Sequence, residues 1–123
     1  MDENITYERG DLIFVDNPLK FPHGHVSCGN HPAVVVQNDK ANEHSSNLVV
    51  AYLTSQLKRL ELPTHVVLQH YEGLRPSMIQ TEQLATIDKG DVLGYINHLR
   101  PEDMIRMDQA LMASLGLEVQ YGG

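Results

Sequence analysis

Two short, continuous apolar runs rich in β-branched residues stand in the first half of the sequence. They are PAVVVQ at residues 32–37 and LVVAYL at residues 48–53. Periodicity alone does not separate a buried strand from a buried helix in runs of this length. Their β-branched content, and the turn-forming clusters at 38–40 and 44–47, favour strands that are buried on both faces.

Further short apolar runs extend this β pattern along the chain. Residues 12–15, 65–68, 77–81 and 84–87 are each predicted as strands, and residues 92–98 are compatible with a strand or a helix. The segment from 16 to 30 is rich in Pro, Gly and Asn, so we predict a long loop there. A loop of this length in a small domain more often has a binding or catalytic role than serves as a simple connection.

The helical period appears only near the end of the sequence. Met104, Met107, Leu111 and Leu115 recur at three- and four-residue steps after Pro101. Proline suits the first helical position, and Gly116 suits the stop. The pattern therefore predicts a mainly β (α+β) fold: a small, strongly bent antiparallel sheet or barrel, closed by a C-terminal helix.

Length and charge narrow the possible functions. The chain has 123 residues, with 9 basic and 16 acidic side chains, which gives a net charge of −7. This length predicts a single domain over residues 1–123, and the acidic balance argues against coating nucleic acid by bulk charge. The absence of a leader pattern and of a long apolar run predicts a cytoplasmic protein without a membrane span. The single cysteine, Cys28, excludes an internal disulfide framework.

Histidines gather in the predicted loop. His23, His25 and His31 lie within nine residues of one another, together with Cys28. These groups are chemically sufficient for a tetrahedral zinc site, but their spacing matches no familiar zinc motif, and solvated loop histidines are the simpler interpretation. His31 differs because it directly precedes Pro32 and a predicted strand, which holds its backbone extended. It is either a structural residue or a general acid or base, since imidazole exchanges protons near neutral pH.

Polar side chains at predicted strand ends are candidate ligand contacts. Thr54, Ser55 and Gln56 end the run at 48–53, where hydroxyl and amide groups can bind phosphate oxygens or base edges. Lys58 follows them closely, and Glu82 and Gln83 lie between two predicted strands. Each of these signals is weak alone, because ordinary turns and solvated surface have the same composition.

Five blocks of sequence, taken in order, resemble one known family. They are GDLIFVD at 10–16, HPAVVVQND at 31–39, AYLTSQ at 51–56, LPTHV at 62–66 and EQLATID at 82–88. Their order and spacing resemble those of the MazF/PemK family of toxin endoribonucleases. The resemblance covers nearly the whole chain, including the terminal helix.

The resemblance implies a small SH3-like β-barrel with a C-terminal helix, assembled as a homodimer. It also implies an endoribonuclease, independent of metals and other cofactors, that cuts single-stranded mRNA at short sequence motifs. A cognate acidic antitoxin would hold it inactive, and any contact with DNA would be indirect, through that antitoxin. The long loop would fold over the RNA.

The resemblance also assigns site residues. Thr54 matches a threonine that holds the phosphate in the family, whereas His31 stands where the family has an arginine that supplies charge. The expected RNA contacts are Ser55, Gln56, Lys58, Glu82 and Gln83. Ala85 stands where many members have a basic residue. These two departures leave an alternative: a catalytically weak or inactive MazF-like protein that retains antitoxin or RNA binding.

Overall fold

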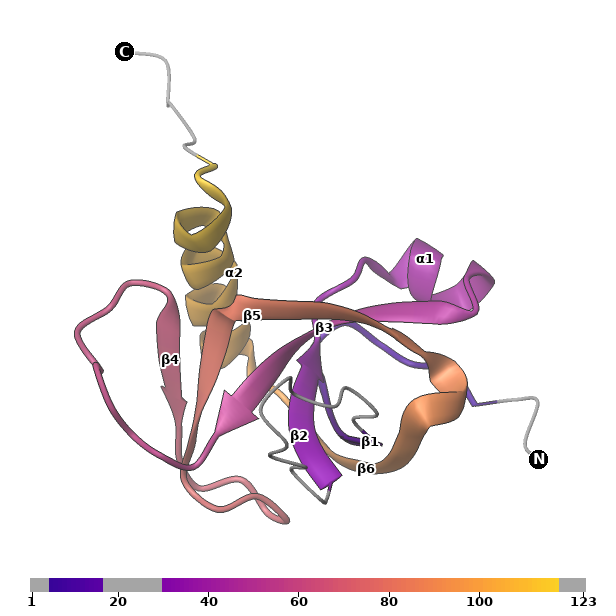
Figure 1. Ribbon diagram of the computed structural model, residues 1–123, viewed down its shortest axis with the longest axis horizontal. Coiled ribbons are helices and arrows are strands. Elements are labelled where there is room, and N and C mark those ends of the chain that lie inside the picture. The colour runs from indigo at the N-terminus through magenta and orange to yellow at the C-terminus, as the bar shows by residue number, and fades with distance from the viewer. Residues whose placement is uncertain (1–4, 17–29, 118–123) are drawn as a thin grey trace, which may run out of the picture.

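The computed structural model describes residues 5–16 and 30–117 (Figure 1). Its strands are β1 (Asp11–Asp16), β2 (Asn30–Val35), β3 (Asn47–Thr54), β4 (His65–Leu68), β5 (Ser77–Asp88) and β6 (Val92–His98). Its α-helices are α1 (Asp39–His44) and α2 (Pro101–Leu115), and a 3-10 turn (Lys89–Asp91) joins β5 to β6. Within the described ranges no helix is long and apolar enough to cross a membrane.

The strands form one antiparallel sheet of six, in the order β4-β5-β3-β2-β1-β6. The sheet curls into a half-barrel, with β1 and β6 passing below β3 and β5 in Figure 1. A break in register between β3 and β5 accompanies this bend. Leu53 pairs with Ile79 and Ala51 pairs with Leu84, so that one residue of β3 faces four of β5. Bulges of this kind increase local twist and bend a strand.

Both faces of the central strands are buried, as predicted from their continuous apolar runs. Val34 and Ala51 belong to a core cluster that also contains Met107 and Ala110 of α2. Ala33 and Val50 belong to a second cluster on the opposite face of the strands. Side chains alternate across a strand, so neighbouring residues of β2 and β3 supply the two cores in turn.

The mainly β fold with a C-terminal helix is confirmed, and so are several element bounds. Residues 65–68 form β4, and α2 begins at Pro101 and ends before Gly116, which takes a left-handed φ of 70° as a C-cap. The ambiguous segment 92–98 is the strand β6. Of the predicted loop from 16 to 30, Asp16 ends β1 and Asn30 begins β2, and 17–29 lie outside the described residues.

Two predictions about elements were wrong. Residues 77–81 and 84–87 are parts of the single strand β5, because the register break bends the strand without ending it. The turn-forming clusters predicted at 38–40 and 44–47 instead contain the two ends of the six-residue helix α1. The Asn38 side chain caps this helix by accepting a hydrogen bond from the Ala41 backbone at 2.9 Å.

Candidate functional site

His31 and Thr54 lie near the ends of the neighbouring central strands β2 and β3. In the β2–β3 ladder, Ala33 pairs with Tyr52 and Val35 with Val50. Continuing this register by two residues places His31 across from Thr54. Residues directly opposite in a ladder project to the same face of a sheet, so the fold brings these two side chains together from separate parts of the sequence.

The two residues line a cleft of about 390 Å³. A cleft of this size is within the range of small-molecule sites, so it suits a nucleotide-sized portion of a ligand. Its walls come from β1, β2, the end of β3, the start of β5 and the loop before β5. They consist of Phe14, His31, Pro32, Leu53, Thr54, Ser55, Gly73, Leu74, Arg75 and Ser77. The lining therefore combines an apolar floor with hydroxyls, one imidazole and one guanidinium.

Each of the paired residues is held by local contacts. The His31 backbone pairs with Val15 of β1, and its ring meets the Tyr52 ring edge to face, with 6.2 Å between the centroids. The Thr54 Oγ1 accepts a hydrogen bond from the Gln56 backbone N–H at 3.1 Å. The Thr54 hydroxyl donates no hydrogen bond among the described residues, so its hydrogen is available to donate to a ligand oxygen in the cleft.

The loop at residues 69–76, which joins β4 to β5, is anchored on α2 through Tyr71. The Tyr71 hydroxyl donates to Asp103 Oδ2 at 2.6 Å and accepts from the Arg100 backbone N–H at 2.8 Å. Burial and the hydrogen bond to Asp103 raise the pKa of Tyr71 to about 12. The loop then turns at Gly73, whose φ of +86° favours glycine. These contacts fix the part of the cleft wall that precedes β5.

Comparison with known proteins identifies the family. Residues 8–115 match the model of the PemK-like, MazF-like toxins of type II toxin-antitoxin systems. The chain belongs to this MazF/PemK family. It is also 40% identical over 115 residues to endoribonuclease EndoA of Bacillus subtilis (strain 168), covering 92% of this chain and 97% of EndoA. It is therefore a homologue of an endoribonuclease toxin.

Solved structures share the fold of this MazF-like chain. An endoribonuclease in complex with its cognate antitoxin from Mycobacterial species superposes with a TM-score of 0.77, at 23% identity, over 93% of this chain and 99% of that one. The MazE–MazF complex (Form-II) from Deinococcus radiodurans gives a TM-score of 0.75, at 17% identity, over 94% of this chain and 100% of that one. The half-barrel with its terminal helix is thus the fold of known MazF structures.

The expected RNA contacts do not all lie together. Ser55 lines the cleft beside Thr54, whereas Gln56, Lys58 and Gln83 are exposed and are not part of its lining. Glu82 is the ion-pair partner of His65, with 2.8 Å between His65 Nε2 and Glu82 Oε2. Ala85 packs against the second core cluster.

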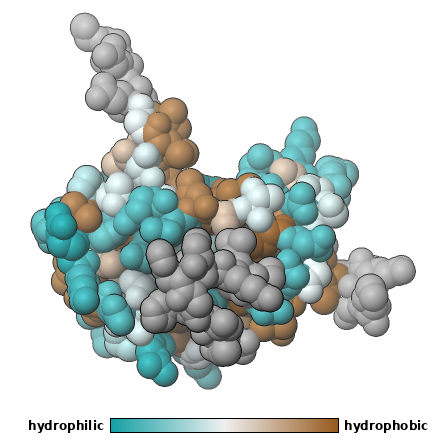
Figure 2. Space-filling view, in the orientation of Figure 1, coloured by the Kyte–Doolittle hydropathy of each residue, from teal (hydrophilic) through white to brown (hydrophobic). Residues whose placement is uncertain are grey.

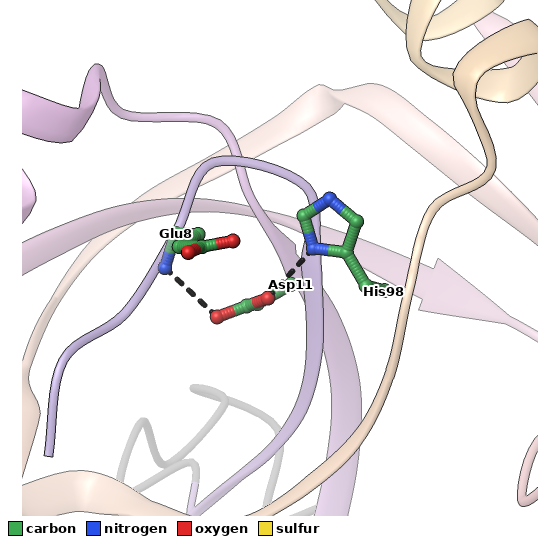
Figure 3. Close-up of side chains that lie close together, drawn as sticks. All are labelled: Glu8, Asp11 and His98. Carbon is green, nitrogen blue, oxygen red and sulfur yellow. Dashed lines mark hydrogen bonds and ion pairs between the residues drawn. The ribbon is translucent and has the colours of Figure 1, made fainter.

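The loop residues that were weighed as possible zinc ligands lie only partly within the described residues. His23, His25 and Cys28 lie outside the described residues. Within residues 5–16 and 30–117, Glu8, Asp11 and His98 bring potential ligand atoms within 4.8 Å of one another (Figure 3). Asp11 accepts from His98 Nδ1 and from the Glu8 backbone N–H, both at 2.8 Å. Each Asp11 oxygen thus has a donor, and the cluster serves to close the turn before β1.

Sequence reasoning missed two polar members of the cleft, Arg75 and Ser77. The Ser77 hydroxyl donates to the Arg75 carbonyl at 2.7 Å, so the serine helps to set the backbone of the loop. Their position depends on how the 69–76 loop packs against α2, and no short motif records that packing.

Proposed function

We propose that this protein is a metal-independent endoribonuclease toxin that cleaves single-stranded mRNA, with His31 and Thr54 as its catalytic residues. The observation that carries the proposal is the placement of these two side chains, from neighbouring strands, on the wall of one cleft. Membership of the MazF/PemK family and the 40% identity to EndoA support the same activity.

The residues suit cleavage by the ribose 2′-hydroxyl. His31 accepts the proton of the 2′-hydroxyl as the 2′-oxygen attacks phosphorus. Thr54 donates a hydrogen bond to a non-bridging phosphate oxygen, where negative charge grows in the transition state. The bond from phosphorus to the 5′-oxygen then breaks, and the imidazolium or a water molecule returns a proton to that oxygen. The products are a 2′,3′-cyclic phosphate and a 5′-hydroxyl fragment.

The test is incubation of the purified protein with a long single-stranded RNA in EDTA, followed by primer extension. We expect discrete cuts at a short sequence motif, and fragments whose 5′ ends accept phosphate from a kinase without prior phosphatase treatment. His31→Ala should abolish the cuts. Thr54→Val should slow them by about 100-fold, and Thr54→Ser, which keeps the hydroxyl, should retain most of the rate. Cleavage that continues unchanged in His31→Ala would remove His31 from the mechanism.

A second function is a binding protein that captures RNA or an antitoxin without effective cleavage. Two observations favour it: the imidazole of His31 at the family's arginine position, and the apolar Ala85. His31→Arg separates the two functions. A loss of activity in this variant supports histidine as the adapted catalyst, whereas a large gain from a silent parent supports the binding protein.

We also propose a homodimer and an acidic antitoxin as partners. An apolar groove of about 400 Å³ runs between α2 and the sheet, and Figure 2 shows hydrophobic colour along the same helix. Its apolar wall includes Val49, Leu84, Leu111, Met112 and Leu115. A second copy covering this groove would bury surface that is otherwise exposed. Leu115→Glu should then convert a dimer to a monomer in light scattering, and an unchanged mass would place the dimer contact elsewhere.

A further inference from the structure

The ionisable side chains that line the cleft are few. In a protein of net charge −7, the described lining contains Arg75 and His31 but no carboxylate. The remaining polar lining is hydroxylic, from Thr54, Ser55 and Ser77. Hydroxyl and guanidinium donors without a competing carboxylate form an environment that attracts an anion.

Arg75 differs from the other arginines of the chain, all of which are among the described residues. Arg9 pairs with Asp108 at 2.6 Å, and Arg59 pairs with Glu61 at 2.8 Å. Arg100 and Arg106 both contact the buried Asp103. The Arg75 guanidinium has no hydrogen-bond or ion-pair partner within residues 5–16 and 30–117, although it is the arginine that lines the cleft.

The backbone on either side of Arg75 is fixed, while its side chain is not. Leu74 packs against the first core cluster, and its N–H bonds to the Tyr71 carbonyl at 3.2 Å. On the other side Pro76 restricts the backbone of Arg75, and the buried Ser77 hydroxyl binds the Arg75 carbonyl. The loop therefore presents an uncommitted cation at the cleft from a well-anchored backbone.

We propose that Arg75 binds the scissile phosphodiester and stabilises the negative charge of the transition state. This inference rests on the nuclease function proposed above and completes its chemistry. The proposed function assigns proton transfer to the imidazole of His31, which leaves charge stabilisation to another group. A guanidinium is permanently charged and can bind two non-bridging oxygens with its planar fork. Proton transfer and charge stabilisation are thus divided between His31 and Arg75, which line the same cleft.

The kinetic test compares single-turnover cleavage of a short RNA containing one mapped site. We expect Arg75→Ala to reduce the cleavage rate by about 100-fold, and Arg75→Lys to reduce it by about 10-fold, because lysine keeps the charge but loses the fork. Arg59→Ala is the matched control, since it removes an equal charge from the exposed segment between β3 and β4, outside the cleft lining. Equal rates in Arg75→Ala and wild-type protein would overturn the proposal and leave the nuclease assignment intact.

A binding test locates the phosphate that Arg75 contacts. The probe is a fluorescent single-stranded oligonucleotide of the same sequence, with 2′-deoxyribose at the scissile position and either a normal linkage or a neutral methylphosphonate there. Arg75→Ala should weaken binding to the normal probe by about 10-fold and have no further effect on the methylphosphonate probe. An equal loss on both probes would overturn the assignment to the scissile phosphate.

The two proposals fail in different ways. If wild-type protein cuts no RNA, the nuclease function fails, and binding of an all-deoxy probe of mixed sequence then tests Arg75 as an anion-binding residue. Weaker binding in Arg75→Ala than in Arg59→Ala supports that role, and equal binding overturns it. The Arg75 side chain has no partner among the described residues, so we expect Arg75→Ala to melt with the wild-type protein.

Discussion

The hydrogen-bond partners of His65 favour its charged form. Its Nδ1 lies 2.9 Å from the Arg59 carbonyl oxygen and its Nε2 lies 2.8 Å from the Glu82 carboxylate. Both neighbours are acceptors, so both ring nitrogens must donate. Burial by itself lowers the pKa of His65, but the hydrogen bonds to Glu82 and to Arg59 outweigh it and leave the pKa raised. For Glu82, burial raises the pKa, and the hydrogen bond from His65 with the other contacts lowers it overall.

The pair predicts a defined pH dependence of stability. The raised pKa of His65 stabilises the folded protein. This stabilisation is complete below pH 6.5, the ordinary pKa of histidine, and is lost as the pH rises through the folded pKa. The lowered pKa of Glu82 gives a stabilising contribution that is present above pH 4.5 and is lost as the pH falls through the folded pKa. Glu82→Gln keeps an acceptor but removes the charge, so it should cost about 1 kcal/mol at pH 5.5 and less at pH 8.5, measured by urea unfolding.

Glu72→Gln is the control for this experiment, because Glu72 is an exposed carboxylate without an ion pair among the described residues. It should leave the pH dependence of the unfolding free energy unchanged. A Glu82→Gln penalty that is as large at pH 8.5 as at pH 5.5 would show that the charge of His65 does not contribute to the stability of the fold.

The residues of the candidate site differ in how far sequence could predict them. His31 and Thr54 could be predicted because they flank two apolar strands, and antiparallel pairing brings the start of one strand near the end of the next. Arg75 could not be assigned to the cleft, since its position follows from a loop packed on α2. For Glu82, the sequence does not show that its partner is His65, 17 residues away.

At the scale of elements, β5 and α1 are the two that the hydrophobic pattern did not predict correctly. The polar pair Glu82 and Gln83 suggested a break between two strands, but the chain continues as one strand because β3 still pairs with it on both sides of the bulge. The helix α1 has six residues, too few for a helical period to appear. By contrast, α2 has 15 residues and a proline and a glycine at its ends, so its bounds follow from sequence.

The start of α2 is tied to the 69–76 loop by one hydroxyl group. Tyr71→Phe should remove the donor to the buried Asp103 and the acceptor for the Arg100 backbone N–H. Loss of a buried hydrogen-bond partner costs about 1–3 kcal/mol, so we expect a destabilisation of about 2 kcal/mol in urea unfolding. We also expect slower RNA cleavage, because the same loop positions Arg75.

Tyr95→Phe is the matched control, since Tyr95 is 63% exposed and has no hydrogen bond to its hydroxyl among the described residues. Its unfolding free energy should stay within about 0.5 kcal/mol of the wild-type value. If Tyr71→Phe is as stable as Tyr95→Phe, the hydroxyl network does not anchor the loop, and the position of Arg75 must depend on the packing of Leu74.

At the scale of the whole molecule, the net charge of −7 restricts how RNA can be held. Counterion release makes non-specific binding depend on the number of phosphates that cations neutralise. Of the described cations, only Lys40, Lys58 and Arg75 lack a bonding partner, and Lys40 lies on α1, away from the cleft lining. Affinity for RNA must therefore come from a few positioned groups, because the electrostatic field of an acidic protein does not attract RNA.

This charge balance predicts a shallow salt dependence for the binding of a short, non-cleavable RNA. Each phosphate neutralised in a single strand contributes about −0.7 to the slope of log K against log salt concentration, so contacts from Lys58 and Arg75 give a slope of about −1.4. Arg75→Ala should reduce the slope to about −0.7, and Lys40→Ala should leave it unchanged. Fluorescence anisotropy between about 50 and 200 mM salt measures these slopes. A wild-type slope steeper than about −3 would mean that many more cations than Lys58 and Arg75 contact RNA.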